Sequence, residues 1–273
     1  MIERFNFYDI YGYLLPGLLF LGLLWLPFGI VDGNWPSAEW TSALAVLVLG
    51  YIAGHLLHGL AEQAFPPVVK DKNNELRFPS FILLADQDKS FSPEVKRRIV
   101  DRILIRFDIN VTDAGNPDPE ILKKRREDAF FLCRRALLQK DVGSYAEQFE
   151  GMYVLMQSLT TVSILTAIYY AGWALASFVL PSFQDVLLYM TVVGVVFALL
   201  WHNTPKLLWL LLAVLLVLGA TAGSDKSLSL YAVSIFLGIS FTLLFIARRF
   251  YASYRQFAFL FAQTVYRDFC ALP

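Results

Sequence analysis

The segment Met152–Leu180 contains neither a charged residue nor a proline, and it constrains the fold more than any other part of the chain. An α-helix rises 1.5 Å per residue, so about 20 apolar residues are enough to cross the hydrocarbon core of a bilayer. The more polar residues that precede it, from Val142 on, also lack proline. We therefore expect one continuous helix over Val142–Leu180 that leaves a soluble domain and passes through the membrane.

Five further apolar blocks accompany this one. Hydrophobic residues make up 57% of the chain and charged residues 17%, against about 45–50% and about 25% in soluble domains. The fold class expected is an all-α integral membrane protein with six transmembrane helices. The predicted spans are Tyr13–Val31, Trp40–Leu60, Met152–Leu180, Val186–Trp201, Leu207–Ala222 and Leu228–Ala247. Val186–Trp201 is short for a full span, so a tilted or re-entrant segment is an alternative.

The charged residues concentrate between the second and third predicted spans. Residues 62–150 hold 16 of the 23 Lys and Arg residues and 16 of the 23 Asp and Glu residues, which predicts a small, mainly helical cytosolic domain there. The expected division is an N-terminal anchor with two spans (1–61), the cytosolic domain (62–150), four spans (151–247) and a C-terminal amphipathic cytosolic helix (248–273). Cys133 and Cys270 fall in segments placed in the cytosol, where thiols stay reduced.

Two helix-start signals divide the cytosolic domain. Ser92, Pro93 and Glu94 supply a cap residue, a proline at the first helical position and an acid in the first turn. Asp118, Pro119 and Glu120 repeat the pattern. The first helix is expected to end near Phe107 and to bury Val95, Ile99 and Ile103, with Leu104 as a further candidate; the second is expected to bury Leu122, Phe130, Cys133 and Leu137. We expect Phe78–Leu84 to be an edge strand, because Pro79 cannot donate to a ladder, and Lys70–Arg77 to be a loop.

Packing signals occur in the second and last spans. Gly50 and Gly54 form a GxxxG pair, which lets another helix approach closely. Arg248 and Arg249 are expected to end the last span. An aromatic stripe then predicts an amphipathic helix over Phe250–Ala271 that lies either on the inner leaflet or on the cytosolic domain. The stripe consists of Phe250, Tyr254, Phe257, Phe261, Val265 and Phe269.

The distribution of basic residues predicts the orientation, because segments rich in Lys and Arg stay on the cytoplasmic side. If the soluble domain is cytoplasmic, both termini are cytoplasmic too, and the outer turns hold only Lys226 among the basic residues. We expect a multi-pass protein of the bacterial inner membrane. The spans show no internal repeat of the transporter kind.

The third predicted span has an unusually polar first half, and two roles for these polar side chains are equally consistent with the sequence. Thr and Gln side chains can line a water-filled path, replacing part of an ion's hydration without a buried charge. They can equally form hydrogen bonds between helices. The pore-lining candidates are Gln157, Thr160, Thr161 and Thr166. No Asp, Glu, Lys or Arg lies at a predicted bilayer centre, which argues against a proton-coupled transporter and a voltage sensor.

The cytosolic domain carries basic clusters suited to phosphates, such as those of anionic lipid, a nucleotide or an oligonucleotide. The ligand-binding candidates are Arg97, Arg98, Arg102, Arg125, Arg126, Arg134 and Arg135. Acids interleave with them, so pairing within helices is the alternative for each cluster. Duplex DNA is not an expected partner.

His55, His58 and Glu62 lie on neighbouring turns near the cytosolic end of the second span. They are a zinc candidate or a pH sensor, but an interfacial polar cluster is the favoured interpretation, since no fourth ligand is evident. The sequence contains no Walker A, GxGxxG, GxSxG or HExxH motif. We therefore expect no enzyme activity, no catalytic residue, no metal site and no cofactor.

Residues 5–17 (FNFYDIYGYLLPG) and 54–59 (GHLLHG) carry a resemblance to a protein family. They resemble segments of small multi-span bacterial membrane effectors encoded in anti-phage defence operons, of which the Hailong-type effector is one. The resemblance covers about the first quarter of the chain. It implies a homo-oligomeric, ion-conducting effector whose cytosolic domain receives a nucleotide or oligonucleotide from a partner nucleotidyltransferase.

Three functions follow as hypotheses. The leading one is an oligomeric channel or membrane-disrupting effector, gated through the cytosolic domain by a nucleotide or oligonucleotide. The second is a non-conducting scaffold or sensor that recruits a cytosolic partner. The third is a metal-dependent membrane enzyme at His55, His58 and Glu62.

Overall fold

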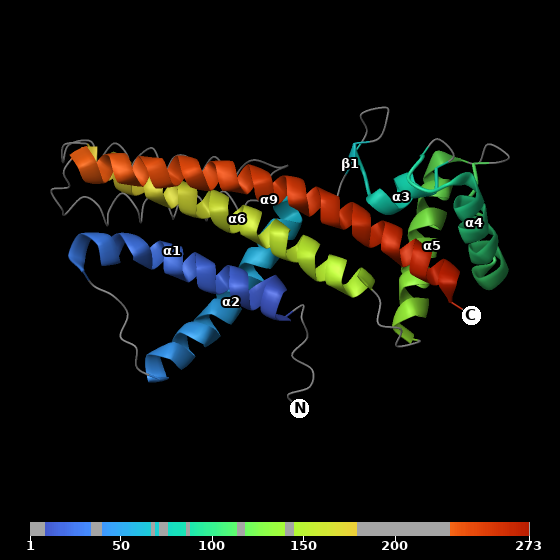
Figure 1. The fold of residues 1–273 in the computed structure, drawn as a ribbon, viewed down its shortest axis with the longest axis horizontal. Helices are drawn as coiled ribbons and strands as arrows, with labels where there is room; N and C mark the ends of the chain where they lie inside the picture. Colours follow the sequence, from blue (N-terminus) through green and yellow to red (C-terminus); the bar gives the residue numbers. More distant parts are fainter. Residues whose placement is uncertain are drawn as a thin grey trace. The chain divides into compact units, whose positions relative to one another are not determined.

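The computed structural model describes residues 9–33, 40–66, 69–70, 76–85, 88–113, 118–139, 145–178 and 230–272, and these ranges are almost entirely helical (Figure 1). The elements are the π-helix η2 (Asp9–Leu14), α1 (Leu15–Asp32), α2 (Trp40–Ala64), β1 (Val69–Lys70), β2 (Leu76–Arg77), α3 (Pro79–Leu83), α4 (Pro93–Phe107), α5 (Pro119–Gln139), α6 (Tyr145–Phe178) and α9 (Leu230–Ala271). The two short strands pair antiparallel, with Val69 opposite Arg77 and Lys70 opposite Leu76.

Four helical segments within the described ranges are long and apolar enough to cross a membrane. They are Asp9–Ile30, Ser42–Ala64, Tyr145–Ala174 and Val233–Ala271, and they overlap the first, second, third and sixth predicted spans. The prediction of a helical chain with several helices able to cross a membrane is confirmed, with four such helices in the described ranges where six were predicted for the whole chain. The predicted spans Val186–Trp201 and Leu207–Ala222 lie outside the described residues.

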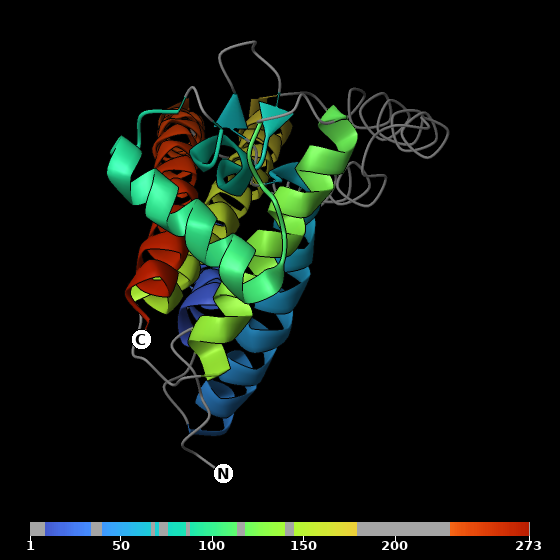
Figure 2. The ribbon, with the colours of Figure 1, turned by 90° about the vertical axis from the view of Figure 1, so that its right-hand side faces the viewer.

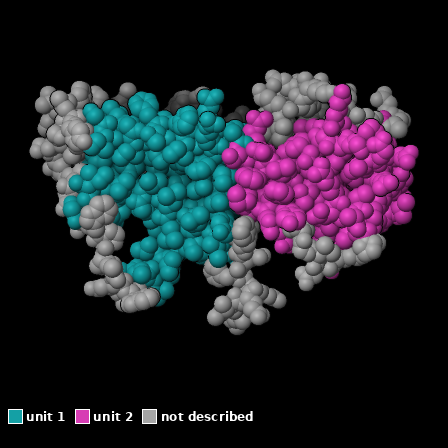
Figure 3. Space-filling model, viewed as in Figure 1, with its two compact units in different colours: residues 1–66, 154–252 teal, residues 67–153, 253–273 magenta. Residues whose placement is uncertain are grey.

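The chain divides into two compact units (Figure 3). Residues 1–66 and 154–252 form what we call the membrane unit, and residues 67–153 and 253–273 form the soluble unit. The soluble unit thus combines the segment inserted between the second and third spans with the C-terminal segment. As a result α6 and α9 each contribute residues to both units.

In the membrane unit, the GxxxG pair of α2 packs against η2 and α1, as its spacing predicts. A Cβ atom on Gly54 would overlap the backbone carbonyl group of Tyr13, and one on Gly17 would overlap the carbonyl oxygen of Gly50. Backbones approach this closely only where the side chain is a hydrogen. Elsewhere α2 exposes large apolar residues, among them Leu44, Leu49 and Leu56, which suits contact with lipid.

The helix α6 is the centre of the membrane unit. In its most apolar window 72% of the residues are buried, against 22% or 28% in the other three candidate spans. Tyr170 and Trp173 pack on Phe236 of α9, and Trp173 also meets Phe28 of α1 edge-on. The predicted continuity of this helix is confirmed over Tyr145–Phe178.

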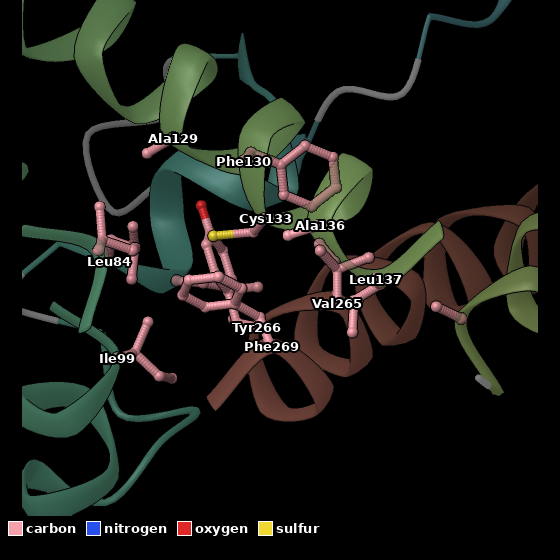
Figure 4. Close-up of a cluster of buried hydrophobic side chains, with 14 of the residues drawn as sticks. Leu84, Ile99, Ala129, Phe130, Cys133, Ala136, Leu137, Val265, Tyr266 and Phe269 are labelled. Atoms are coloured by element: carbon pink, nitrogen blue, oxygen red, sulfur yellow. The ribbon is translucent and has the colours of Figure 1, made fainter. Parts of the chain in front are cut away.

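In the soluble unit, α4 lies across α5 (Figure 2), and the C-terminal half of α9 completes the core. Figure 4 shows Phe130 and Cys133 of α5 facing Val265, Tyr266 and Phe269 of α9. The aromatic stripe expected over Phe250–Ala271 therefore packs on the soluble domain, the second of the two placements considered. Further ring contacts join α6 to α9 here, between Phe149 and Phe257 and between Tyr153 and Phe261.

The two helices predicted from their caps are confirmed. Ser92 Oγ accepts a hydrogen bond from the Val95 N–H at 3.4 Å at the start of α4, and Asp108 ends the helix in the left-handed conformation. Asp118 Oδ1 accepts from the Glu120 N–H at 2.9 Å at the start of α5. The predicted core residues are buried, except that Val95 is partly buried. Leu104 was a wrong candidate: it is 44% exposed, because it follows Ile103 by about 100° around the helix.

Two other local predictions were wrong. Phe78–Leu84 contains the helix α3, not a strand: Pro79 takes the first helical position, where its missing N–H costs nothing, and only Phe78 is extended. The strands lie at the ends of 69–77, a stretch largely expected to be loop, of which 71–75 are outside the described residues. The predicted amphipathic helix over Phe250–Ala271 is the second half of α9, which runs unbroken through Arg248 and Arg249 because arginine is a good helix former.

We expect Gly54→Ala to lower the free energy of unfolding by about 1–3 kcal/mol, because the new methyl group would push the backbone of η2 away from α2. Thermal unfolding of the full chain in detergent measures this. Gly59→Ala is the matched control on the same helix, since among the described residues no atom other than the neighbouring backbone of α2 itself lies within 4 Å of the position that its Cβ would take. Equal effects of the two substitutions would refute the packing role of Gly54.

Burial raises the pKa of the Cys133 thiol, so it stays neutral in the folded protein well above the ordinary thiol range. In a Cys270→Ser protein at pH 8, we expect a maleimide to leave Cys133 unlabelled until the chain is unfolded, as mass spectrometry would show. The unfolded thiol ionises at about pH 8.5, so stability falls as pH rises above that value. Cys133→Ala should reduce this alkaline loss; rapid labelling of folded Cys133 would contradict the prediction.

Candidate functional site

The polar side chains of α6 between Gln157 and Thr166, which we call the polar row, are buried inside the membrane unit. The four pore-lining candidates Gln157, Thr160, Thr161 and Thr166 are each no more than 2% exposed. The three threonine hydroxyls donate to carbonyl oxygens of their own helix, on Met156 at 2.7 Å, on Gln157 at 3.3 Å and on Val162 at 2.7 Å. Such bonds satisfy a hydroxyl in an apolar surrounding without a partner from another helix.

Gln157 joins α6 to the end of α2. Its side-chain amide donates to the carbonyl oxygens of Ala61 at 3.1 Å and of Phe65 at 2.6 Å. The carbonyl oxygen of Ala61 also accepts from the Phe65 N–H at 2.8 Å. That of Phe65 lies just past the last helical residue, Ala64, where carbonyls have no helical donor. Gln157 therefore supplies donors at the place where α2 stops.

The two prolines of α1 are matched by hydroxyl donors on α6. Pro27 cannot donate to the carbonyl oxygen of Leu23, four residues earlier, and the Tyr170 hydroxyl donates to that oxygen at 2.8 Å. The neighbouring Tyr169 hydroxyl donates to the carbonyl oxygen of Leu24 at 3.2 Å. Pro16 likewise cannot donate to Gly12, whose carbonyl oxygen accepts from Ser158 Oγ at 3.5 Å.

Neither tyrosine was among the residues predicted from the sequence to donate between helices. The signal was Pro27, because a proline within a membrane helix indicates a carbonyl that needs a donor from elsewhere. What the sequence does not contain is the identity of the donor. A further bond of this kind, from Ser240 of α9 to the carbonyl oxygen of Ala167 at 2.8 Å, had no such signal.

His55 and His58 form an aromatic cluster with η2. The His55 ring stacks on Tyr13 with centroids 3.9 Å apart, and the His58 ring meets Tyr13 edge-on at 5.1 Å. His58 Nε2 lies 3.4 Å from Glu62 Oε1. Within the described part of the chain, no group of three or more His, Cys, Asp or Glu residues is placed to hold a metal ion. This geometry agrees with an interfacial polar cluster.

The seven basic candidates do not converge on one site. Arg126 is 5% exposed, and its guanidinium donates to Asp113 Oδ1 at 2.9 Å and to the carbonyl oxygen of Val111 at 3.1 Å. Arg134 donates to both carboxylate oxygens of Glu150, at 2.6 and 2.8 Å. The candidates that remain exposed at the surface are Arg97, Arg98, Arg125 and Arg135.

Arg102 binds the C-terminal end of α9. Its guanidinium donates to the carbonyl oxygen of Cys270 at 2.6 Å and to that of Leu272, and it lies over the ring of Phe269. A cation at a helix C-terminus satisfies carbonyls that have no helical donor and opposes the negative end of the helix dipole. Arg102 thus secures the C-terminal end of a helix that also contributes to the membrane unit.

Comparison with known proteins finds no matching family model, no matching curated protein and no matching solved structure.

We expect Tyr170→Phe to lower the free energy of unfolding by about 1 kcal/mol, because Leu23 loses its donor. In a Pro27→Ala background the restored N–H of residue 27 can donate to Leu23, so the same substitution should then cost close to nothing. Thermal unfolding of the four proteins gives the coupling between the two positions. Independent, additive effects would show that Tyr170 does not compensate for Pro27.

Proposed function

We propose that this protein is a homo-oligomeric membrane effector that conducts ions or disrupts the bilayer when its soluble unit binds a signal. The signal is a nucleotide or oligonucleotide, supplied by a partner nucleotidyltransferase in bacterial anti-phage defence. The protein spans the inner membrane with both termini in the cytoplasm. It acts without a cofactor and without catalysis.

One observation carries this proposal: α6 and α9 each contribute to both units and pack on each other in both. In the soluble unit they meet through Phe149, Phe257 and other rings. In the membrane unit they meet through Tyr170, Phe236 and the hydrogen bond from Ser240. Under this proposal, a displacement of the helix pair in the soluble unit is the step that changes its packing in the membrane unit and so gates the channel.

Under this proposal, the arrangement in which the polar row is buried is the closed state of the channel. Gln157 holds α6 to the end of α2 through two hydrogen bonds and Ser158 holds it to η2 through one, each of modest strength. A rotation of α6 would exchange these bonds for contacts with water or with the polar row of another copy. The four exposed arginines Arg97, Arg98, Arg125 and Arg135 are the residues that support binding of a phosphate-bearing signal.

The test is ion flux through the full chain in liposomes, without nucleotide, with a mixture of the four nucleoside triphosphates, and with short single-stranded oligonucleotides. We expect nucleotide-dependent flux, and a changed rate or ion selectivity in Gln157→Leu/Thr161→Val. Thr242→Val is the matched control, since Thr242 bonds to its own helix but is exposed. Arg97→Ala/Arg98→Ala should raise the nucleotide concentration for half-maximal flux about tenfold.

A non-conducting scaffold that recruits a cytosolic partner is the second candidate. It is favoured by the polar row, whose side chains are buried and donate to carbonyl oxygens of α6, of η2 and at the end of α2. Absence of flux from folded oligomer under every condition above, together with capture of a stable partner by the soluble unit, would replace the channel with the scaffold.

A further inference from the structure

The outer face of α5 exposes large apolar side chains although the helix belongs to the soluble unit. Phe131 is 55% exposed, Leu138 53% and Ile121 51%, whereas Phe130 and Leu137 of the same helix are at most 8% exposed. Successive residues differ by about 100° around a helix, and the three exposed residues fall within about a third of the circumference. Exposed apolar residues that share one face of a helix usually mark a contact surface.

Charged residues of both signs alternate with these apolar residues on the same face. Lys124, Glu127, Asp128 and Arg135 are all exposed there. The order along the face is apolar, basic, acidic, apolar, basic, apolar. Phe131 lies near the middle, with the two acids one turn before it and Arg135 one turn after it.

This order of side chains is complementary to itself when a second α5 helix runs in the opposite direction. If two α5 helices lie antiparallel with Phe131 opposite Phe131, Arg135 of each copy lies opposite Glu127 and Asp128 of the other. Lys124 of each copy then lies opposite Leu138, and its aliphatic stem can cover the leucine. A parallel arrangement would instead place Lys124, Asp128 and Arg135 each against its own equivalent, so that like charges repel.

We propose that this face of α5 binds the α5 helix of a second copy of the chain, antiparallel and about a two-fold axis near Phe131. The contact is isologous: each copy supplies the acids and the arginine that the other needs. A bilayer surface is a poorer occupant, because the two acids on this face cancel the attraction of anionic lipid for its two bases. The proposal deepens the proposed function by locating an oligomer contact in the soluble unit, and it leaves Arg97, Arg98 and Arg125 for the signal.

Cross-linking of the full chain in liposomes at low protein-to-lipid ratio tests the contact. The background is Cys270→Ser, in which the remaining native thiol, Cys133, is buried. Phe131→Cys should give a covalent dimer with a short bismaleimide, because the two copies of residue 131 face each other. Lys123→Cys, exposed on another side of α5, is the matched control and should give at least about tenfold less dimer.

Charge exchange then tests the register. In the Phe131→Cys protein, Arg135→Glu should reduce the dimer about tenfold, and so should Glu127→Lys/Asp128→Lys, because each leaves like charges opposite one another. Combining the three substitutions restores opposite charges and should restore cross-linking. Restoration is not expected if the substitutions merely unfold the unit.

Three outcomes would overturn the proposal. They are equal cross-linking at positions 123 and 131, failure of the combined substitutions to restore the dimer, and protection of the thiol introduced by Phe131→Cys from maleimide without any dimer. The last would assign the face to lipid or to a different protein. Ion flux measured on the same liposomes separates the two proposals: loss of the dimer with flux retained refutes only this contact, and a dimer without flux refutes only the channel.

Discussion

The membrane unit depends on one constraint: a backbone carbonyl in an apolar surrounding needs a donor. Pro16 and Pro27 leave the carbonyl oxygens of Gly12 and Leu23 without their usual helical donors, and the carbonyl oxygen of Phe65 lies just past the end of α2. Side chains of α6 donate to the carbonyl oxygens concerned, from Ser158, Tyr170 and Gln157 respectively. The central position of α6 follows, because the helix that supplies these donors must lie against both neighbours.

The helix α6, which supplies these donors, also contributes residues to the soluble unit. There the cohesion comes from aromatic burial: rings of α6 pack on rings of α9, and α9 in turn fills the core beside α5. Arg102 of α4 then secures the C-terminal end of α9. Hydrogen bonds in one unit and packed rings in the other thus act on the same two helices.

Much of the local structure could be predicted from sequence, and the exceptions have local causes. Ser92 and Asp118 indicated their helices because a cap residue acts on the N–H groups two or three positions away. Gly54 indicated a close contact because only glycine permits it. The prediction for Phe78–Leu84 was wrong because a proline signals an edge strand and a helix start equally well. Of the six predicted spans, four overlap the long apolar helices of the described ranges, and the other two lie outside those ranges.

The sequence by itself determined the membrane class, the extent of α6 and the caps of α4 and α5, because each follows from neighbours in the chain. Only the tertiary structure decided the roles of the polar and basic side chains. Arg125 and Arg126 are adjacent and identical in type, yet one is exposed and the other is buried against Asp113. A side chain's role depends on which groups from distant segments lack a partner beside it, and that is known only once the helices are packed.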